Sequence, residues 1–246
     1  MKKIYIPILA ALLFVGCGGG STNTADATNE TGETTPSTSI TVENSTNEPN
    51  TTSPDTFFNA PLLTQSEKQD YLDAINDARR VQRDCGRVIG IDAEGKEIKV
   101  YDGTDIMPSV GDLVWNDGLY SAAAEHSKDL AAWNNGIEIE TEARKRFSHD
   151  GSGTTSDWTS QKLELGRGST VSERGDNNGY IGFVGENITA GTNTDTEVDA
   201  VNKWLSSPGH CKNMMDPNYK EVGMAVVEDA DSFYTYYWTQ NLGVPQ

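Results

Sequence analysis

A long segment near the start of the chain is too polar to contribute to a packed core. Residues 18–60 are rich in Thr, Ser, Asn, Glu, Gly and Pro, and they contain neither Lys nor Arg. Such a segment buries too little apolar surface to offset the conformational entropy that folding removes. We therefore expect residues 18–60 to form a disordered acidic tether. Residues 61–246 are long enough for one compact domain with its own core.

The first 17 residues have the pattern of a secretory signal. Two lysines precede an apolar run over residues 4–15, which is too short to span a bilayer as a mature helix. The run ends in FVGC, which resembles the lipobox of bacterial lipoproteins, although Phe14 stands where that motif usually has Leu. The resemblance implies cleavage before Cys17 and lipidation of its thiol. The alternative is an ordinary secreted protein in which Cys17 is a free thiol.

The net charge of the chain argues against some classes of binding partner. The formal net charge is −18, from 37 acidic and 19 basic side chains. An acidic surface repels phosphate backbones, so we expect no nucleic-acid partner. It gives no attraction to anionic lipid either, so we expect the membrane to be reached through the N-terminal lipid anchor. We expect a monomer, held outside the cytoplasm in the bacterial cell envelope, either in the periplasm or at the cell surface.

Helical patterns recur through the first two thirds of the domain. Residues 64–67 read TQSE, a capping box that predicts a helix running to about residue 84. Apolar runs at residues 88–91 and 98–101 predict a small hairpin at an edge. A second helix, ending at about residue 133, is predicted by apolar positions that repeat at helical spacing. These positions are Leu119, Ala123, His126, Leu130 and Trp133.

The last part of the chain combines one more long helix with strands. Residues 194–197 read TDTE, another capping box, and the helix that follows is predicted to stop at Ser206. EVGMAVVE and FYTYYWTQNLG alternate β-branched and aromatic residues, which predicts a hairpin in the centre of an antiparallel sheet. Helices and strands do not alternate regularly. The fold class is therefore expected to be α+β, with helices covering the sheet.

The three histidines can be weighed one by one. His126 lies on the apolar face of its helix, where a core histidine with a satisfied hydrogen bond is the better interpretation. His149 and His210 each lie in a Gly/Ser-rich loop, and Glu186 is expected in a third loop within GENITAG. Two imidazoles and a carboxylate from separate loops make a candidate divalent-metal site. The spacing itself contains no HExxH or CxxC motif that would specify a metal.

Cysteine usage favours a disulfide. If Cys17 is lipidated, Cys85 and Cys211 are left over, and in an oxidising compartment two such cysteines usually pair. The competing interpretation makes Cys211 a nucleophile with His210 as its base. Side chains of adjacent residues diverge, so this second interpretation is the weaker one.

Five motifs, in order, resemble those of the CAP superfamily, which includes the cysteine-rich secretory proteins, insect venom allergens and plant pathogenesis-related proteins. They are LVWNDGLYSAAAEHSKDLA, FSHDG, GENITAG, WLSSPGHCKNMMDPNYKEVGMAV and YYWTQNLG. The motifs lie within residues 113–243, and the resemblance as a whole covers residues 64–243. The version found here is similar to the bacterial SCP-like branch. The resemblance implies an α-β-α sandwich with a central antiparallel sheet and a cleft.

The resemblance also implies a cleft tetrad of two histidines and two acids. Matched by motif, His149, Glu186 and His210 take three of these positions, and Ser207 stands where many eukaryotic members have the second acid. Some family members bind a divalent metal through the two histidines, so Zn²⁺ is the candidate cofactor. Cys85 and Cys211 match a cysteine pair that recurs in this branch.

Three hypotheses for function follow. The first is a tethered binding module whose cleft takes a small ligand, a lipid, a divalent metal or an envelope component. The second is a metal-dependent hydrolase or peptidase that uses His149, Glu186 and His210. The third gives the tetrad a purely structural role. The missing acid at Ser207 weakens general-base catalysis and favours binding, and no catalytic residue is assigned firmly.

Overall fold

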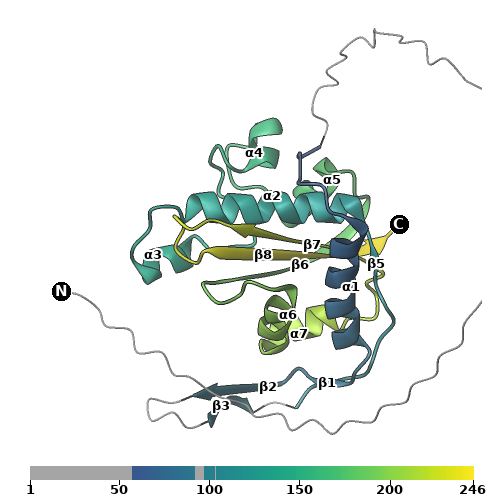
Figure 1. Ribbon diagram of the computed structural model, residues 1–246. Coiled ribbons are helices and arrows are strands. Elements are labelled where there is room, and N and C mark those ends of the chain that lie inside the picture. Colours follow the sequence, from purple (N-terminus) through teal and green to yellow (C-terminus); the bar gives the residue numbers. More distant parts are fainter. Residues whose placement is uncertain (1–56, 92–96, 103) are drawn as a thin grey trace, which may run out of the picture. The chain divides into compact units, whose positions relative to one another are not determined.

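The computed structural model describes residues 57–91, 97–102 and 104–246 (Figure 1). The expected signal, Cys17 and the tether up to residue 56 lie outside these ranges. No helix within them is both long enough and apolar enough to cross a bilayer. The helices are α1 (Gln65–Arg79), α2 (Asp117–Trp133), α3 (Glu140–Lys145), α4 (Trp158–Lys162), α5 (Val171–Asn177), α6 (Glu197–Leu205) and α7 (Pro208–Met214). The strands are β1 (Arg83–Asp84), β2 (Arg87–Ile91), β3 (Glu97–Asp102), β4 (Ile106–Met107), β5 (Val114–Trp115), β6 (Gly182–Gly191), β7 (Glu221–Glu228) and β8 (Tyr236–Pro245).

The main sheet has four strands in the order β5-β7-β8-β6. The predicted C-terminal hairpin, β7 and β8, occupies its centre. β8 and β6 pair antiparallel over the whole length of β6, and β5 pairs with β7 in parallel. The sheet is therefore mixed, because a short parallel strand joins an otherwise antiparallel arrangement. Among the described residues β6 pairs with β8 alone, which makes it an edge strand.

Helices cover both faces of this sheet, which confirms the expected α-β-α sandwich (Figure 1). On one face, α2 packs Leu130 against Ile188 and Tyr237. On the other face, α1, α6 and α7 pack around Trp204 and Trp238, both of which are fully buried. Val222, Met224 and Trp238 lie on this second face, as their alternation predicts. Tyr234 precedes β8 and packs on the α2 face instead.

The first helix is shorter than predicted, and the hairpin stands apart from the main sheet. The capping box forms as expected between Thr64 and Glu67, but α1 ends at Arg79 rather than near residue 84. The backbone N–H of Val110 bonds to the Arg79 carbonyl, and Val81 is 54% exposed, so no core contact extends the helix. The predicted hairpin is present as β2 and β3, but these form a two-stranded sheet of their own.

The segment after α6 differs from its predicted loop. The N-cap of α6 is Thr196, whose side chain accepts from the Asp199 N–H, so the capping box predicted at residues 194–197 is wrong by two positions. Helix α6 stops as expected, but α7 begins at once, with Ser207 at its N-cap and Pro208 at its first position. Proline is favoured there because the first helical N–H needs no partner. His210 and Cys211 are therefore helical.

The predicted disulfide is confirmed. Cys85 and Cys211 are bonded across a sequence separation of 126 residues, with their Cα atoms 5.4 Å apart. Both are buried beside Met215. The thiol of Cys211 is therefore not free to act as a nucleophile, which removes the Cys–His interpretation. The bond joins the segment that follows α1 to α7 and so helps to place His210.

Candidate functional site

Glu186 is the buried centre of the site. It lies in β6 rather than in the predicted loop, and its side chain is 1% exposed. One carboxylate oxygen, Oε1, accepts from Nδ1 of His149 at 2.9 Å, and it lies 3.6 Å from Nε2 of His126. The other oxygen, Oε2, accepts from Nη2 of Arg174 at 2.9 Å. Both oxygens therefore have strong donors.

These neighbours decide the charge state of the site. Burial by itself raises the pKa of Glu186, but the adjacent His126 and Arg174 and the hydrogen bond from His149 outweigh it and lower that pKa to about 2. Burial lowers the pKa of His126 to about 4, and the positive charge of Arg174 adds to the effect. At neutral pH the site therefore contains a carboxylate held by a guanidinium, next to an uncharged buried imidazole.

The loop that carries His149 is held by hydrogen bonds from two buried side chains to its backbone carbonyls. Nε2 of His126 donates to the carbonyl of Ser148 at 3.0 Å, and Nη2 of Arg174 donates to the carbonyl of His149 at 2.8 Å. His126 is a core histidine as predicted, but it also supports this loop. Because Nδ1 of His149 donates to Glu186, the ring presents Nε2 as its remaining polar atom. The side chain of His149 is 51% exposed and open to a ligand.

His210 reaches the same region from helix α7. Its carbonyl accepts from Nδ2 of Asn187, and Asn213 on the same helix donates to the Asn187 side chain and to the Glu186 carbonyl. These amides attach α7 to β6. Burial lowers the pKa of His210, and the nearby His149 lowers it further, so the imidazole is neutral at pH 7. The predicted residues therefore come from a loop, a strand and a helix, not from three loops.

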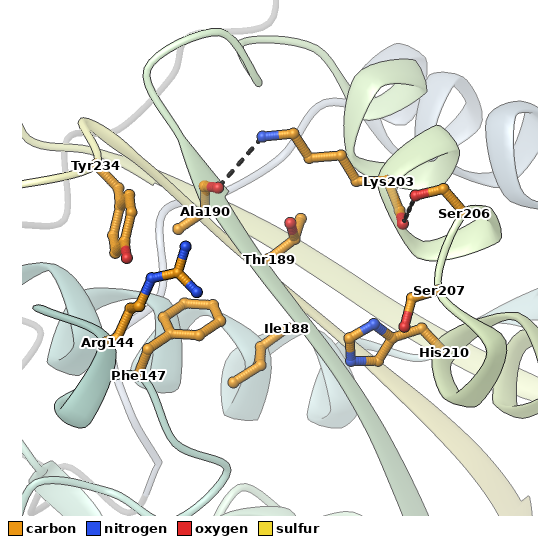
Figure 2. A pocket seen from close by; sticks show the side chains of 10 residues that line it. All are labelled: Arg144, Phe147, Ile188, Thr189, Ala190, Lys203, Ser206, Ser207, His210 and Tyr234. Atoms are coloured by element: carbon orange, nitrogen blue, oxygen red, sulfur yellow. Dashed lines mark hydrogen bonds between the residues drawn. The ribbon is translucent and has the colours of Figure 1, made fainter. Parts of the chain in front are cut away.

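Two hollows meet at His210. The first, called here the tetrad hollow, has a volume of about 500 Å³. Its lining residues are His149, Glu186, Asn187, Gly209, His210, Lys212, Asn213 and Asp216. The second, called here the strand-edge groove, has a volume of about 550 Å³ (Figure 2). Its lining residues are Arg144, Phe147, Ile188, Thr189, Ala190, Lys203, Ser206, Ser207, His210 and Tyr234.

Ser207 lies in the strand-edge groove and not in the tetrad hollow. The other carboxylate in the tetrad hollow, Asp216, accepts at Oδ1 from the N–H and the side-chain amide of Asn218, as a turn residue does. Within the described ranges, no group of three or more His, Cys, Asp and Glu residues is arranged to hold a metal. His149 and His210 are the two available imidazoles, while Glu186 serves to orient His149.

Sequence reasoning did not identify Arg174 as part of the site. Arg174 lies on α5 and is 1% exposed, and its side chain also donates to the carbonyl and hydroxyl of Ser169. It is an ordinary arginine in a polar helix that follows a capping box, so no local pattern sets it apart. Only the packing of α5 against β6 shows that it neutralises Glu186.

The chain is similar to several known proteins. Over 57 residues the chain is 41% identical to the uncharacterized protein YkwD of Bacillus subtilis, a match that covers 23% of this chain and 20% of YkwD. A solved extracellular protein of Bacillus anthracis that contains an SCP domain is 23% identical, with a TM-score of 0.37, over 56% of this chain and 35% of that protein. A solved outer surface protein of Borrelia burgdorferi is 17% identical, with a TM-score of 0.39, over 56% of this chain and 80% of that one.

The chain thus spans a minor part of YkwD and of the Bacillus anthracis protein. The family comparison extends much further along this chain. Residues 72–242 match the profile of the cysteine-rich secretory protein family. They include every helix and strand of the sandwich except residues 65–71 of α1 and residues 243–245 of β8. The chain belongs to this family, also known as CAP.

Proposed function

We propose that this chain is a binding module in which the tetrad hollow binds a ligand and does not catalyse its chemical conversion. The observation that carries the proposal is the state of Glu186. Its carboxylate is buried, and its two oxygens accept from His149 and Arg174, so it is not free to take a proton from water. A general base needs both access to the proton and a pKa near the working pH, and the buried carboxylate with its pKa of about 2 has neither.

The same contacts suit His149 and His210 for binding. Glu186 fixes the ring of His149 from behind, in the way that carboxylates orient metal-ligating histidines. Two imidazoles supply fewer ligands than a closed zinc site, which has four. A divalent metal would therefore complete its coordination with water or with groups of the ligand. When bound, it would act as a Lewis acid, and these two residues would hold it.

A second candidate function is a metal-dependent hydrolase or peptidase that uses His149, Glu186 and His210. The observation in its favour is that His149 lines the tetrad hollow with a half-exposed ring whose Nε2 atom is not used by the bond to Glu186. Against it stand the engaged Glu186 and the serine at position 207, which removes the second acid from the motif.

The chain contains only three histidines, so each imidazole signal in an NMR spectrum can be assigned by a single substitution. We expect Zn²⁺ titration to shift the signals of His149 and His210 and to leave that of His126 unchanged, because His126 is fully buried. We expect the whole chain, with zinc or with chelator, to cleave casein and cell-wall material no faster than the His149→Ala/His210→Ala variant. Hydrolysis that this variant loses would establish the second candidate instead. Unchanged signals for zinc, lipid vesicles and peptides alike would contradict a binding role.

We also propose that the module is tethered outside the cytoplasm by a lipid on Cys17. The support is the FVGC motif and the polar segment that follows it. We expect labelled palmitate to be incorporated by the wild type in cells and not by Cys17→Ser. Label retained in the variant, or absent from the wild type, would refute the anchor.

A further inference from the structure

The floor of the strand-edge groove is the free edge of β6. Ile188, Thr189 and Ala190 are consecutive residues of this strand, and all three line the groove. Figure 2 shows them with Arg144, Phe147 and Tyr234 on one side and with Lys203, Ser206, Ser207 and His210 on the other. One wall therefore comes from the α2 layer of the sandwich and the other from α6 and α7.

The pairing register shows which backbone groups point into the groove. Along an antiparallel strand, successive residues direct their N–H and C=O alternately toward and away from the partner strand. The carbonyl of Glu186 accepts from Asn213 at 3.2 Å, and the carbonyl of Ala190 accepts from Lys203 at 3.2 Å, so both face away from β8. Ile188 lies between them in the same alternation, so its N–H and C=O face the groove.

The partner strand supports the same assignment. Asn241 and Gly243 of β8 lie opposite Glu186 and Val184 of β6. The carbonyl of Gly243 accepts from the N–H of Lys220, on the side of the sheet where β7 lies. These β8 residues therefore direct their backbone groups toward β7, which leaves the opposite residues of β6 without a strand partner.

The open part of the edge is short and bounded at both ends. Asn213 occupies the Glu186 carbonyl at one end, and Lys203 occupies the Ala190 carbonyl at the other. Four residues of extended chain separate these carbonyls by about 13 Å. Between them, no described residue bonds to the N–H or C=O of Ile188. A free edge of this kind is a template for another strand.

The charges of the residues that line the groove indicate which side chains an added peptide strand would carry. None of the 10 residues that line it is acidic, although the chain as a whole has 37 acidic side chains. Arg144 and Lys203 both lie beside Ala190, at one end of the groove (Figure 2). An acidic side chain on the incoming strand would therefore meet two cations, of which Arg144 already pairs with Glu140 of its own helix.

We propose that the strand-edge groove binds a short extended peptide, which adds a strand to β6 through Ile188 and places an acidic side chain near Arg144 and Lys203. Main-chain hydrogen bonds give this mode of recognition its affinity, and side-chain contacts give its specificity. The inference rests on the proposed binding function and names its ligand class. The peptide would lie against Ser207 and His210, which connects the groove to the tetrad hollow.

The probes are acetylated and amidated tetrapeptides of β-branched residues. One has aspartate at the last position, one has aspartate at the first position, and a neutral control has asparagine in its place. With so few contacts we expect a Kd on the order of 1 mM for the better acidic peptide. In NMR titrations of the whole chain, the backbone amides of Ile188 and Ala190 should shift most. No amide shift in β6 with any peptide would overturn the proposal.

Methylation of single peptide nitrogens tests whether the peptide pairs as a strand. An N-methyl group on the residue that donates to Ile188 removes one hydrogen bond and blocks the close approach of the two backbones. We expect this peptide to bind at least tenfold more weakly, whereas methylation of the next nitrogen, which faces away, should have little effect. If neither methyl group changes the affinity, the groove binds the carboxylate without strand pairing, and the proposal fails.

A matched pair of protein variants tests the charge. Arg144 lines the groove and Lys145 does not, yet both are exposed residues of α3 that pair with a glutamate of the same helix. We expect Arg144→Glu to weaken the acidic peptide about fivefold and the neutral peptide little, and Lys145→Glu to affect neither. Equal effects of the two variants would show a general charge effect and contradict a site at Arg144.

Two further outcomes identify other occupants of the edge. Shifts of the Ile188 amide that depend on protein concentration and not on peptide would mean that a second copy pairs with β6, which overturns the proposal. Zinc could also shift the signals of His149 and His210 while no peptide shifts the amide of Ile188. That result would refute the peptide proposal but leave the proposed binding function of the tetrad hollow intact. The two proposals therefore fail separately.

Discussion

The buried ion pair between Glu186 and Arg174 gives the sharpest test of how the site is built. Both side chains are 1% exposed, and Oε2 lies 2.9 Å from Nη2. Removing one partner of a buried pair leaves the other charge without compensation, which costs about 3–5 kcal/mol. We expect Glu186→Gln to lower the free energy of unfolding by about 3 kcal/mol, at the low end of that range, because glutamine can still accept one hydrogen bond from Arg174.

Arg174→Met should cost more, since Arg174 also donates to the carbonyls of Ser169 and His149. Each lost bond adds about 1 kcal/mol. The double variant leaves no uncompensated charge, so its loss should be close to that of Arg174→Met alone. The coupling free energy should then be about 2–3 kcal/mol.

Urea unfolding at pH 7, followed by tryptophan fluorescence with the disulfide intact, measures all four proteins. The exposed pair Arg144–Glu140 is the matched control, for which we expect additive effects. Losses at Glu186 and Arg174 that add to within about 0.5 kcal/mol would refute the electrostatic account of the site. Such a result would mean that packing of the two side chains, and not their charges, holds β6 to α5.

Two further predictions concern how the disulfide and the protonation of His126 contribute to stability. Reducing the disulfide, or replacing its cysteines in Cys85→Ser/Cys211→Ser, should lower stability by up to ~5 kcal/mol, because the closed loop spans 126 residues; an unchanged urea midpoint would contradict this. Lowering the pH should also destabilise the fold. The unfolded chain binds a proton on His126 near pH 6.5, but the folded chain does so only near pH 4, so stability is lost as the pH falls through this window. The loss should reach ~3 kcal/mol and be much smaller in His126→Gln, in which the lowered pKa of His210 still contributes. An equal pH dependence in both proteins would show that His126 is not responsible.

Much of the fold could be predicted from patterns along the chain. The capping box at Thr64, the apolar face of α2 and the alternation of β7 and β8 are local signals, and the structure confirms all three. The errors lie where local signals compete. Ser207 and Pro208 stop one helix and are equally suited to start another, and a pattern alone does not say which.

The site could be predicted only in part, for a different reason. The family motifs brought His149, Glu186 and His210 together, and the structure places them around one hollow. Their spacing carried no such information, because the contacts join residues far apart in the chain. The roles of Arg174 and His126 follow from the packing of α5 and α2 against β6, which no single stretch of sequence encodes.

The disulfide also decides how the domain would carry a mechanical load. Cys85 follows α1, and Cys211 lies on α7, so the shortest covalent path from the N-terminal side to the C-terminus bypasses everything between them. A pull on the two ends of the chain would be transmitted through α1, across the sulfur–sulfur bond, and on to β7 and β8. His149, Glu186 and the whole of β6 lie within the bypassed loop, so traction on the ends would not draw on that part of the backbone.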